Sequence, residues 1–210
     1  MKPIKNIIFD FGGVFLNIDF TRSYIEFQKL GIPSFHKLFD GYLQTNLFRD
    51  LEIGTISSKQ FADSIRYLAG MNLTDAQIFY AWNALLLDLP AKRLSVLKTA
   101  ASHYRIFLLS NTNQIHYEVY NSDFRNKYGY DFNDLFEKAF WSHQIGVRKP
   151  EASAFDYVIN QTGIIKEETL FIDDGIMHIQ SAKAMGFRVH HLISKEINEL
   201  FDNLGRLIEY

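Results

Sequence analysis

Short apolar segments that end at polar residues alternate with longer stretches of helical periodicity, and this alternation constrains the fold more than any other feature of the sequence. The first segment, residues 4–9, is rich in β-branched and aromatic side chains and stops at Asp10. Similar runs follow at residues 106–109, 139–141, 170–172 and 189–192. Runs of this length and composition are typical of buried strands. Strands separated by helices predict an α/β fold with a mostly parallel sheet.

The segment of residues 20–89 breaks this alternation, because it contains helical patterns and no convincing strand. Its apolar residues repeat at helical spacing in three groups: Tyr24, Phe27 and Leu30; Phe61, Ile65 and Leu68; Ile78, Trp82 and Leu85. An all-helical insertion at this point follows the first strand. We therefore expect it to cover the carboxyl ends of the strands, where such sheets bind ligands. Its aromatic residues, Trp82 among them, are expected to form its own apolar core.

Composition and charge narrow the class of partner. The 210 residues are 47% apolar and carry a net charge of −2, which indicates a globular protein and favours neither nucleic acid nor an anionic membrane as partner. No apolar stretch approaches the roughly 18 residues of a membrane span, and no cleavage site follows the N-terminal apolar run. With no cysteine, we expect a reducing, cytoplasmic location.

His190 and His191, adjacent on a predicted strand, would point to opposite faces, a poor geometry for zinc. Nothing in the sequence indicates an oligomeric state.

Polar side chains follow four of the predicted strands and would meet at one edge of the sheet. In chain order they are Asp10, Ser110, Asn111, Lys149, Asp173 and Asp174. Two adjacent carboxylates at the end of an apolar strand repel each other and are best tolerated beside a cation. Together with Asp10, this pair predicts a site of hard oxygen ligands suited to Mg²⁺.

These residue types are those that phosphoryl transfer requires. A carboxylate beside the cation can attack phosphorus and form an aspartyl-phosphate, which water then hydrolyses. Mg²⁺ and Lys149 would neutralise the phosphoryl oxygens. The Ser110 hydroxyl and the backbone amides around Gly12 and Gly13 would donate hydrogen bonds to the same oxygens.

Four motifs contain these residues, and through them the chain resembles the haloacid dehalogenase superfamily. The motifs stand in the same order as in that family and span nearly the whole sequence. They read Ile-Phe-Asp10-Phe-Gly12-Gly13-Val, Leu-Leu-Ser110-Asn111-Thr-Asn, Gly-Val-Arg148-Lys149-Pro150-Glu and Phe-Ile-Asp173-Asp174. The resemblance implies an α/β fold in which residues 1–19 and 90–210 form a Rossmann-like core and residues 20–89 form an inserted helical cap. The string Glu52-Ile-Gly54-Thr-Ile56-Ser, followed by Phe61, resembles a cap segment of one branch of the family. That branch contains glucose-1-phosphate phosphatases and the phosphatase domain of soluble epoxide hydrolases.

The resemblance also implies roles around a metal ion. Asp10 would be both the nucleophile and a Mg²⁺ ligand. Asp174 would bind the ion directly, and Asp173 directly or through water. Gly12 would contribute its backbone carbonyl.

For the substrate, the resemblance implies that Ser110 and Asn111 hold the phosphate. Lys149 would orient the nucleophile and balance its charge. The expected activity is Mg²⁺-dependent hydrolysis of a small phosphorylated metabolite, such as a sugar phosphate, with Mg²⁺ as cofactor.

Two positions depart from the family pattern. Gly12 stands where most phosphatases of the superfamily have an Asp that protonates the leaving oxygen. Without another acid in its place, the absence of this Asp would lower the rate by roughly 10²- to 10⁴-fold. Asp19 is a candidate replacement, although an N-cap before Thr21 is its expected role. A leaving group of low pKa, such as an anomeric oxygen, would need less protonation. His178 replaces an Asn or Asp of the family and is expected beside the ligands or at the surface.

Two alternatives remain open. One is a dehalogenase, in which the same Asp attacks carbon without a metal; the Asp173-Asp174 pair argues against it. The other is a non-catalytic binding protein that kept the fold after losing the acid at Gly12; the retained motif residues argue against this one.

Overall fold

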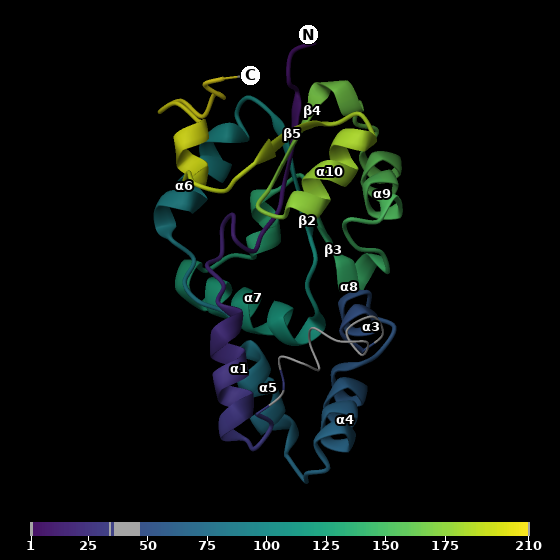
Figure 1. Cartoon of the computed structure of the whole chain (residues 1–210). Helices are drawn as coiled ribbons and strands as arrows, with labels where there is room; N and C mark the ends of the chain where they lie inside the picture. Colours follow the sequence, from purple (N-terminus) through teal and green to yellow (C-terminus); the bar gives the residue numbers. More distant parts are fainter. Residues whose placement is uncertain (1, 34, 36–46, 210) are drawn as a thin grey trace.

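The computed structural model describes residues 2–33, 35 and 47–209 and contains a five-stranded parallel sheet, which lies in the upper half of the view in Figure 1. In the order β3-β2-β1-β4-β5, the strands are Lys138–Trp141, Arg105–Ser110, Asn6–Phe9, Thr169–Asp173 and Arg188–His191. Each contains one of the predicted apolar runs or most of it, which confirms the α/β fold with a parallel sheet. Because β1 pairs with β2 on one side and β4 on the other, the carboxyl ends of these three strands are neighbours.

Helices cover both faces of the sheet, because side chains along each strand alternate between two apolar clusters. In β1, Ile7 and Phe9 belong to the cluster that includes α6 (Ala91–Ala100) and α7 (Gln114–Tyr128). Ile8 belongs to the cluster that includes α9 (Ala152–Thr162) and α10 (Ile176–Ala184). This is the two-residue period of a strand buried on both faces. Short helical turns complete this part, namely η2 (Phe132–Leu135), α8 (Ser142–Ile145), η3 (Lys166–Glu168) and η4 (Ile197–Leu200).

The described residues of the segment 20–89 form helices joined by turns and loops, as predicted. Its helices in the described ranges are α1 (Phe20–Lys29), α3 (Arg49–Glu52), α4 (Ser58–Ala69) and α5 (Asp75–Asn83), and no strand lies among the described residues of 20–89. Asp19 is the N-cap of α1, as expected, since its carboxylate accepts a hydrogen bond from the Thr21 N–H at 2.9 Å. None of the helices in the described part of the chain combines the length and apolarity needed to cross a bilayer.

Aromatic side chains fill the interior of this helical segment. Trp82 packs against Phe48 and Phe61, with ring centroids 5.4 and 5.6 Å apart, in a cluster separate from the two that flank the sheet. Rings of this size bury much apolar area in a segment of short helices. Trp82 therefore has the core role expected of it.

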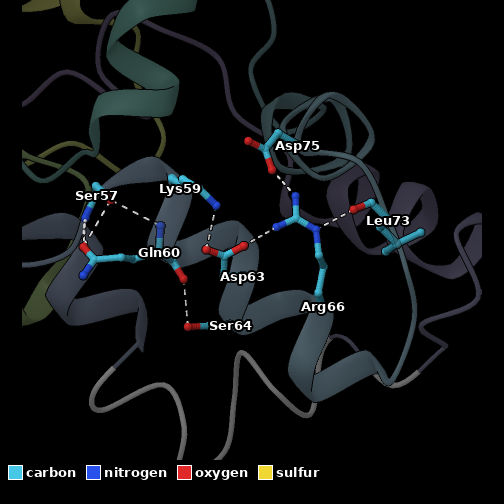
Figure 2. Close-up of polar contacts among 8 residues, drawn as sticks. All are labelled: Ser57, Lys59, Gln60, Asp63, Ser64, Arg66, Leu73 and Asp75. Carbon is cyan, nitrogen blue, oxygen red and sulfur yellow. Dashed lines mark hydrogen bonds and ion pairs between the residues drawn. The ribbon is translucent and has the colours of Figure 1, made fainter.

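Arg66 connects α4 to α5 at the surface of the segment (Figure 2). Its guanidinium contacts the carboxylate of Asp63 one turn earlier in α4, the backbone carbonyl of Leu73, and the carboxylate of Asp75 in the first turn of α5. One planar donor group thus holds acceptors from both helices and from the loop between them.

Candidate active site

Asp10, Lys149 and Asp173 form a buried charged group at the carboxyl ends of β1 and β4. The Lys149 ammonium lies 2.7 Å from an Asp10 carboxylate oxygen and 2.6 Å from an Asp173 oxygen. Lys149 and Asp173 are fully buried. The two strands are adjacent, and Asp10 extends their ladder by donating its N–H to the Ile172 carbonyl. The parallel sheet therefore brings together predicted site residues from three distant segments.

Ser110 is the last residue of β2 and Asn111 follows it, on the other side of β1. Ser110 is buried at the end of its strand. The Asn111 side chain binds the backbone of Lys149: its Nδ2 donates to the Lys149 carbonyl at 2.7 Å, and its Oδ1 accepts from the Lys149 N–H at 2.9 Å. Asn111 thus positions the lysine. The contact of Asn111 with phosphate stays a prediction. Its backbone N–H or the second N–H of its side chain would have to make that contact.

The carboxylates fit a divalent cation. Oxygen atoms of Asp10, Asp173 and Asp174 lie within 4.8 Å of one another, and these residues are the one such cluster of potential ligands in the part of the chain that the structure describes. When all are ionised, the three carboxylates and the Lys149 ammonium leave a formal charge of −2. An all-oxygen donor set with this excess of negative charge suits Mg²⁺, a hard cation.

Burial and charge set the pKa values of this group apart. Burial raises the pKa of Asp10 to about 7, although the Lys149 ammonium opposes the shift. Burial also acts upward on Asp173, but Lys149 and His178 outweigh it and lower its pKa to about 2. Burial acts downward on Lys149, whose pKa is nevertheless raised by Asp10 and Asp173. The protein therefore compensates the charge of Asp10 less than that of Asp173, and a cation beside Asp10 would favour its ionised form.

His178 lies beside the candidate ligands, one of its two expected placements. Its Nδ1 is 2.9 Å from Asp173 Oδ1, which also accepts the Gly175 N–H at 2.7 Å. Asp173 Oδ2 accepts from Lys149. Because three donors already occupy Asp173, Asp10 and Asp174 keep more lone pairs for direct contact with an ion.

Gly13 leaves room for the Asp174 carboxylate. Its φ is +73°, and a Cβ at this position would lie 2.0 Å from Asp174 Oδ2. We expect Gly13→Ala to displace this carboxylate and weaken Mg²⁺ binding about tenfold or more, as measured by calorimetric titration. Gly163→Ala is the matched control, because its φ is +67° and a Cβ there meets nothing within 4 Å. Equal Mg²⁺ affinities for the two variants would contradict the role of Gly13.

The helical segment contacts the loop that carries Lys149. The sequence motifs did not predict these contacts. Glu52 Oε2 lies 2.8 Å from Arg148 Nη1. Burial raises the pKa of Glu52, and Arg148 opposes the shift. Gly54 has a φ of +72°, and a Cβ there would lie 2.2 Å from the His143 carbonyl oxygen, so this glycine permits close approach. The Glu-x-Gly string therefore sits where the helical segment meets the strand loops.

A cavity of about 110 Å³ opens between the helical segment and the carboxyl edge of the sheet. Its lining includes Gly12, Ser110, Asn111, Glu52, Trp82 and His116. Of the predicted phosphate-binding residues, Gly12, Ser110 and Asn111 thus line the same space as the helical segment. Trp82 lines this space in addition to its core role, and His116 is a lining residue that the sequence motifs did not single out.

The sequence and the fold are similar to those of known proteins. The model of the haloacid dehalogenase-like hydrolase family matches residues 4–186. D-ribitol-5-phosphate phosphatase of Bacteroides thetaiotaomicron is 35% identical over 88% of this chain and 89% of its own. A crystal structure of a HAD family enzyme from the same organism, in complex with magnesium and inorganic phosphate, is 33% identical and covers 95% of this chain and 100% of its own, with a TM-score of 0.86. The structure of a predicted HAD-like family hydrolase from Porphyromonas gingivalis is 31% identical and covers 94% of this chain and 95% of its own, with a TM-score of 0.85.

Proposed function

We propose that this chain, which belongs to the haloacid dehalogenase-like hydrolase family, is a Mg²⁺-dependent phosphatase that hydrolyses the phosphate monoester of a small polyol or sugar. The relative that acts on D-ribitol 5-phosphate and the similar structure that holds magnesium and phosphate support this proposal. We also propose a division into a core of residues 1–19 and 90–210 and a cap of residues 20–89. The separate apolar cluster of the helical segment supports that division.

The observation that carries the proposal is the buried contact of Lys149 with both Asp10 and Asp173. Held by this contact, an Asp10 carboxylate oxygen attacks phosphorus; an oxygen–phosphorus bond forms as the ester bond breaks, and the departing alkoxide oxygen takes a proton from solvent water to leave as the alcohol. Water then attacks phosphorus, releasing inorganic phosphate and restoring Asp10. Lys149 orients Asp10 and offsets the negative charge of the phosphoryl group.

The remaining site residues bind the phosphoryl oxygens and the metal ion. We assign the phosphate to Ser110, Asn111, Lys149 and the backbone amides of Gly12 and Gly13. We assign Mg²⁺ to Asp10, Asp174 and the Gly12 carbonyl, with Asp173 in contact directly or through water. When bound, Mg²⁺ adds positive charge at the phosphoryl oxygens.

The missing acid at Gly12 affects how easily the leaving group of the substrate departs. Gly12 has no side chain at the position of the usual acid, and Asp19, the candidate replacement, is engaged as the N-cap of α1. A terminal polyol phosphate releases an ordinary primary alcohol, whereas an anomeric phosphate releases a more acidic oxygen. Because the relative acts on a phosphorylated polyol, we propose terminal phosphates as the better substrates. Phosphate release from ribitol 5-phosphate, glucose 6-phosphate and glucose 1-phosphate tests this; faster cleavage of glucose 1-phosphate would favour the low-pKa leaving group instead.

Removal of the metal is expected to stop the reaction. EDTA should lower phosphate release by about 10³-fold or more, and added Mg²⁺ should restore it, because the clustered carboxylates would then lack their counter-charge. Halide release from 2-chloropropionate that persists under chelation would support the dehalogenase alternative. Absence of any turnover across phosphorylated metabolites with Mg²⁺ would support the binding-protein alternative.

We also propose that the protein acts in the cytoplasm on this small substrate, without nucleic acid or a membrane as partner. The absence of cysteine and the net charge of −2 support this placement. Cell fractionation followed by immunodetection tests it, and recovery in a membrane or secreted fraction would contradict it.

A further inference from the structure

His116 brings a buried imidazole to the wall of the cavity. It lies in the first turn of α7, where its N–H donates to the side chain of the N-cap Asn113 at 3.1 Å. Its ring stacks on Trp82 of α5, with centroids 4.9 Å apart and planes inclined by 26°. Only 7% of the residue is exposed. The ring is thus held between the helical segment and the sheet-covering helix α7, at the edge of the cavity.

Asn83, the last residue of α5, selects the tautomer of this ring. Asn83 Oδ1 lies 2.8 Å from His116 Nδ1 and, as an acceptor, keeps the proton on that nitrogen. Burial lowers the pKa of His116 to about 3, so the ring is neutral at physiological pH. Among the described residues, His116 forms its side-chain hydrogen bond through Nδ1, which leaves the Nε2 lone pair available as an acceptor.

The surroundings of this acceptor determine what kind of ligand fits it. Phe20 and Leu86 line the cavity as apolar groups, and Ser110 and Asn111 line it at the catalytic edge. A phosphate ester bound at that edge would extend its alcohol chain into the space that His116 borders. An acceptor in the wall of a partly apolar cavity favours a ligand that supplies a donor, and the hydroxyl groups of a polyol or sugar do so.

We propose that His116 is a specificity-determining residue whose Nε2 accepts a hydrogen bond from a hydroxyl group of the substrate's leaving chain. This inference rests on the proposed phosphatase function and narrows it to esters of hydroxylated alcohols. Asn83 is a positioning residue that acts through the imidazole. Because the single ring proton is held by Asn83, His116 does not replace the acid missing at Gly12.

The test compares wild type with His116→Phe on two esters of equal chain length, ribitol 5-phosphate and n-pentyl phosphate, both with Mg²⁺. Phenylalanine keeps an aromatic ring against Trp82 and removes the acceptor. We expect kcat/KM for ribitol 5-phosphate to fall about tenfold, while the value for n-pentyl phosphate changes less than about twofold. Equal losses on both esters would assign a purely structural role to His116, and no loss on ribitol 5-phosphate would also overturn the inference.

Two further measurements apply even where the phenylalanine variant does not fold. Nitrogen NMR of the wild-type His116 ring should show Nδ1 protonated and Nε2 unprotonated between about pH 5 and pH 8, and a proton on Nε2 would overturn the inference. Asn83→Leu should give mixed tautomers and a lower preference for ribitol 5-phosphate over n-pentyl phosphate, and an unchanged preference would argue against the positioning role. Failure of the wild type to hydrolyse any phosphate ester would instead contradict the phosphatase function itself.

Discussion

Replacement of Asp10 by asparagine is expected to abolish phosphate release, with a loss in kcat of roughly 10³-fold or more. An amide does not attack phosphorus as a carboxylate does, and the variant also loses one of the three anionic groups around the proposed ion. The measurement is release of inorganic phosphate from ribitol 5-phosphate at saturating Mg²⁺. Unchanged turnover would remove Asp10 from the reaction and would contradict the proposed mechanism.

The Asp10→Asn variant should still fold. Lys149 keeps its contact with Asp173 at 2.6 Å, so the buried ammonium is not left without a carboxylate.

Asp19→Asn is a useful control, because asparagine caps a helix about as well as aspartate and α1 should keep its start. That variant should retain wild-type turnover and thermal stability. A large loss of turnover on Asp19→Asn would instead identify Asp19 as the acid that Gly12 lacks.

Replacement of Lys149 by methionine is expected to destabilise the metal-free protein by about 3–5 kcal/mol and to abolish turnover. The ammonium is fully buried between Asp10 and Asp173, and its removal leaves two buried carboxylates without their shared counter-charge. Urea unfolding in metal-free buffer measures the loss. Lys183→Met is the control, because Lys183 is exposed in the last turn of α10 and should change the free energy of unfolding little. A similar effect of the two substitutions would contradict the role assigned to the buried ammonium.

The stability of the Lys149→Met variant should also depend on pH in a defined direction. Loss of the ammonium raises the pKa of Asp10 further above its unfolded value and removes the main group that lowers the pKa of Asp173, so that burial and mutual repulsion raise this pKa as well. Groups with raised folded-state pKa values stabilise the fold most below their unfolded values, and that contribution is lost as the pH rises through the folded ones. The deficit relative to wild type should therefore be larger near pH 8 than near pH 5. A deficit independent of pH would indicate that the substitution acts through packing alone.

The fold and the carboxylate centre could be predicted because the features that specify them are local. Asp10 and Asp173 each directly follow three apolar residues at the end of a predicted strand, and a parallel sheet brings such strand ends to one edge. The N-cap at Asp19 followed from the residue type and its place before a helical pattern. The proposed roles of these residues in catalysis remain predictions that the variants above test.

The contacts that shape the cavity could not be predicted in this way. Glu52 meets Arg148, and Asn83 meets His116, across segments that are far apart in the chain. Neither partner belongs to a pattern whose spacing indicates the other, since each contact depends on how the helical segment packs over the sheet. Asn111 is an intermediate example: its place after a strand was predicted, but its hydrogen bonds to the backbone of Lys149 were not.

Hydrophobic periodicity and strand-end chemistry were therefore sufficient to identify the α/β sheet, the helical insertion and the carboxylates and lysine at their common edge. Both signals arise within a few residues of chain, where backbone geometry alone relates one side chain to the next. The tertiary structure decided which groups face the cavity and in what protonation state, including the neutral ring of His116. Those properties depend on burial and on partners from other segments, and they exist only once the helical segment has packed against the sheet.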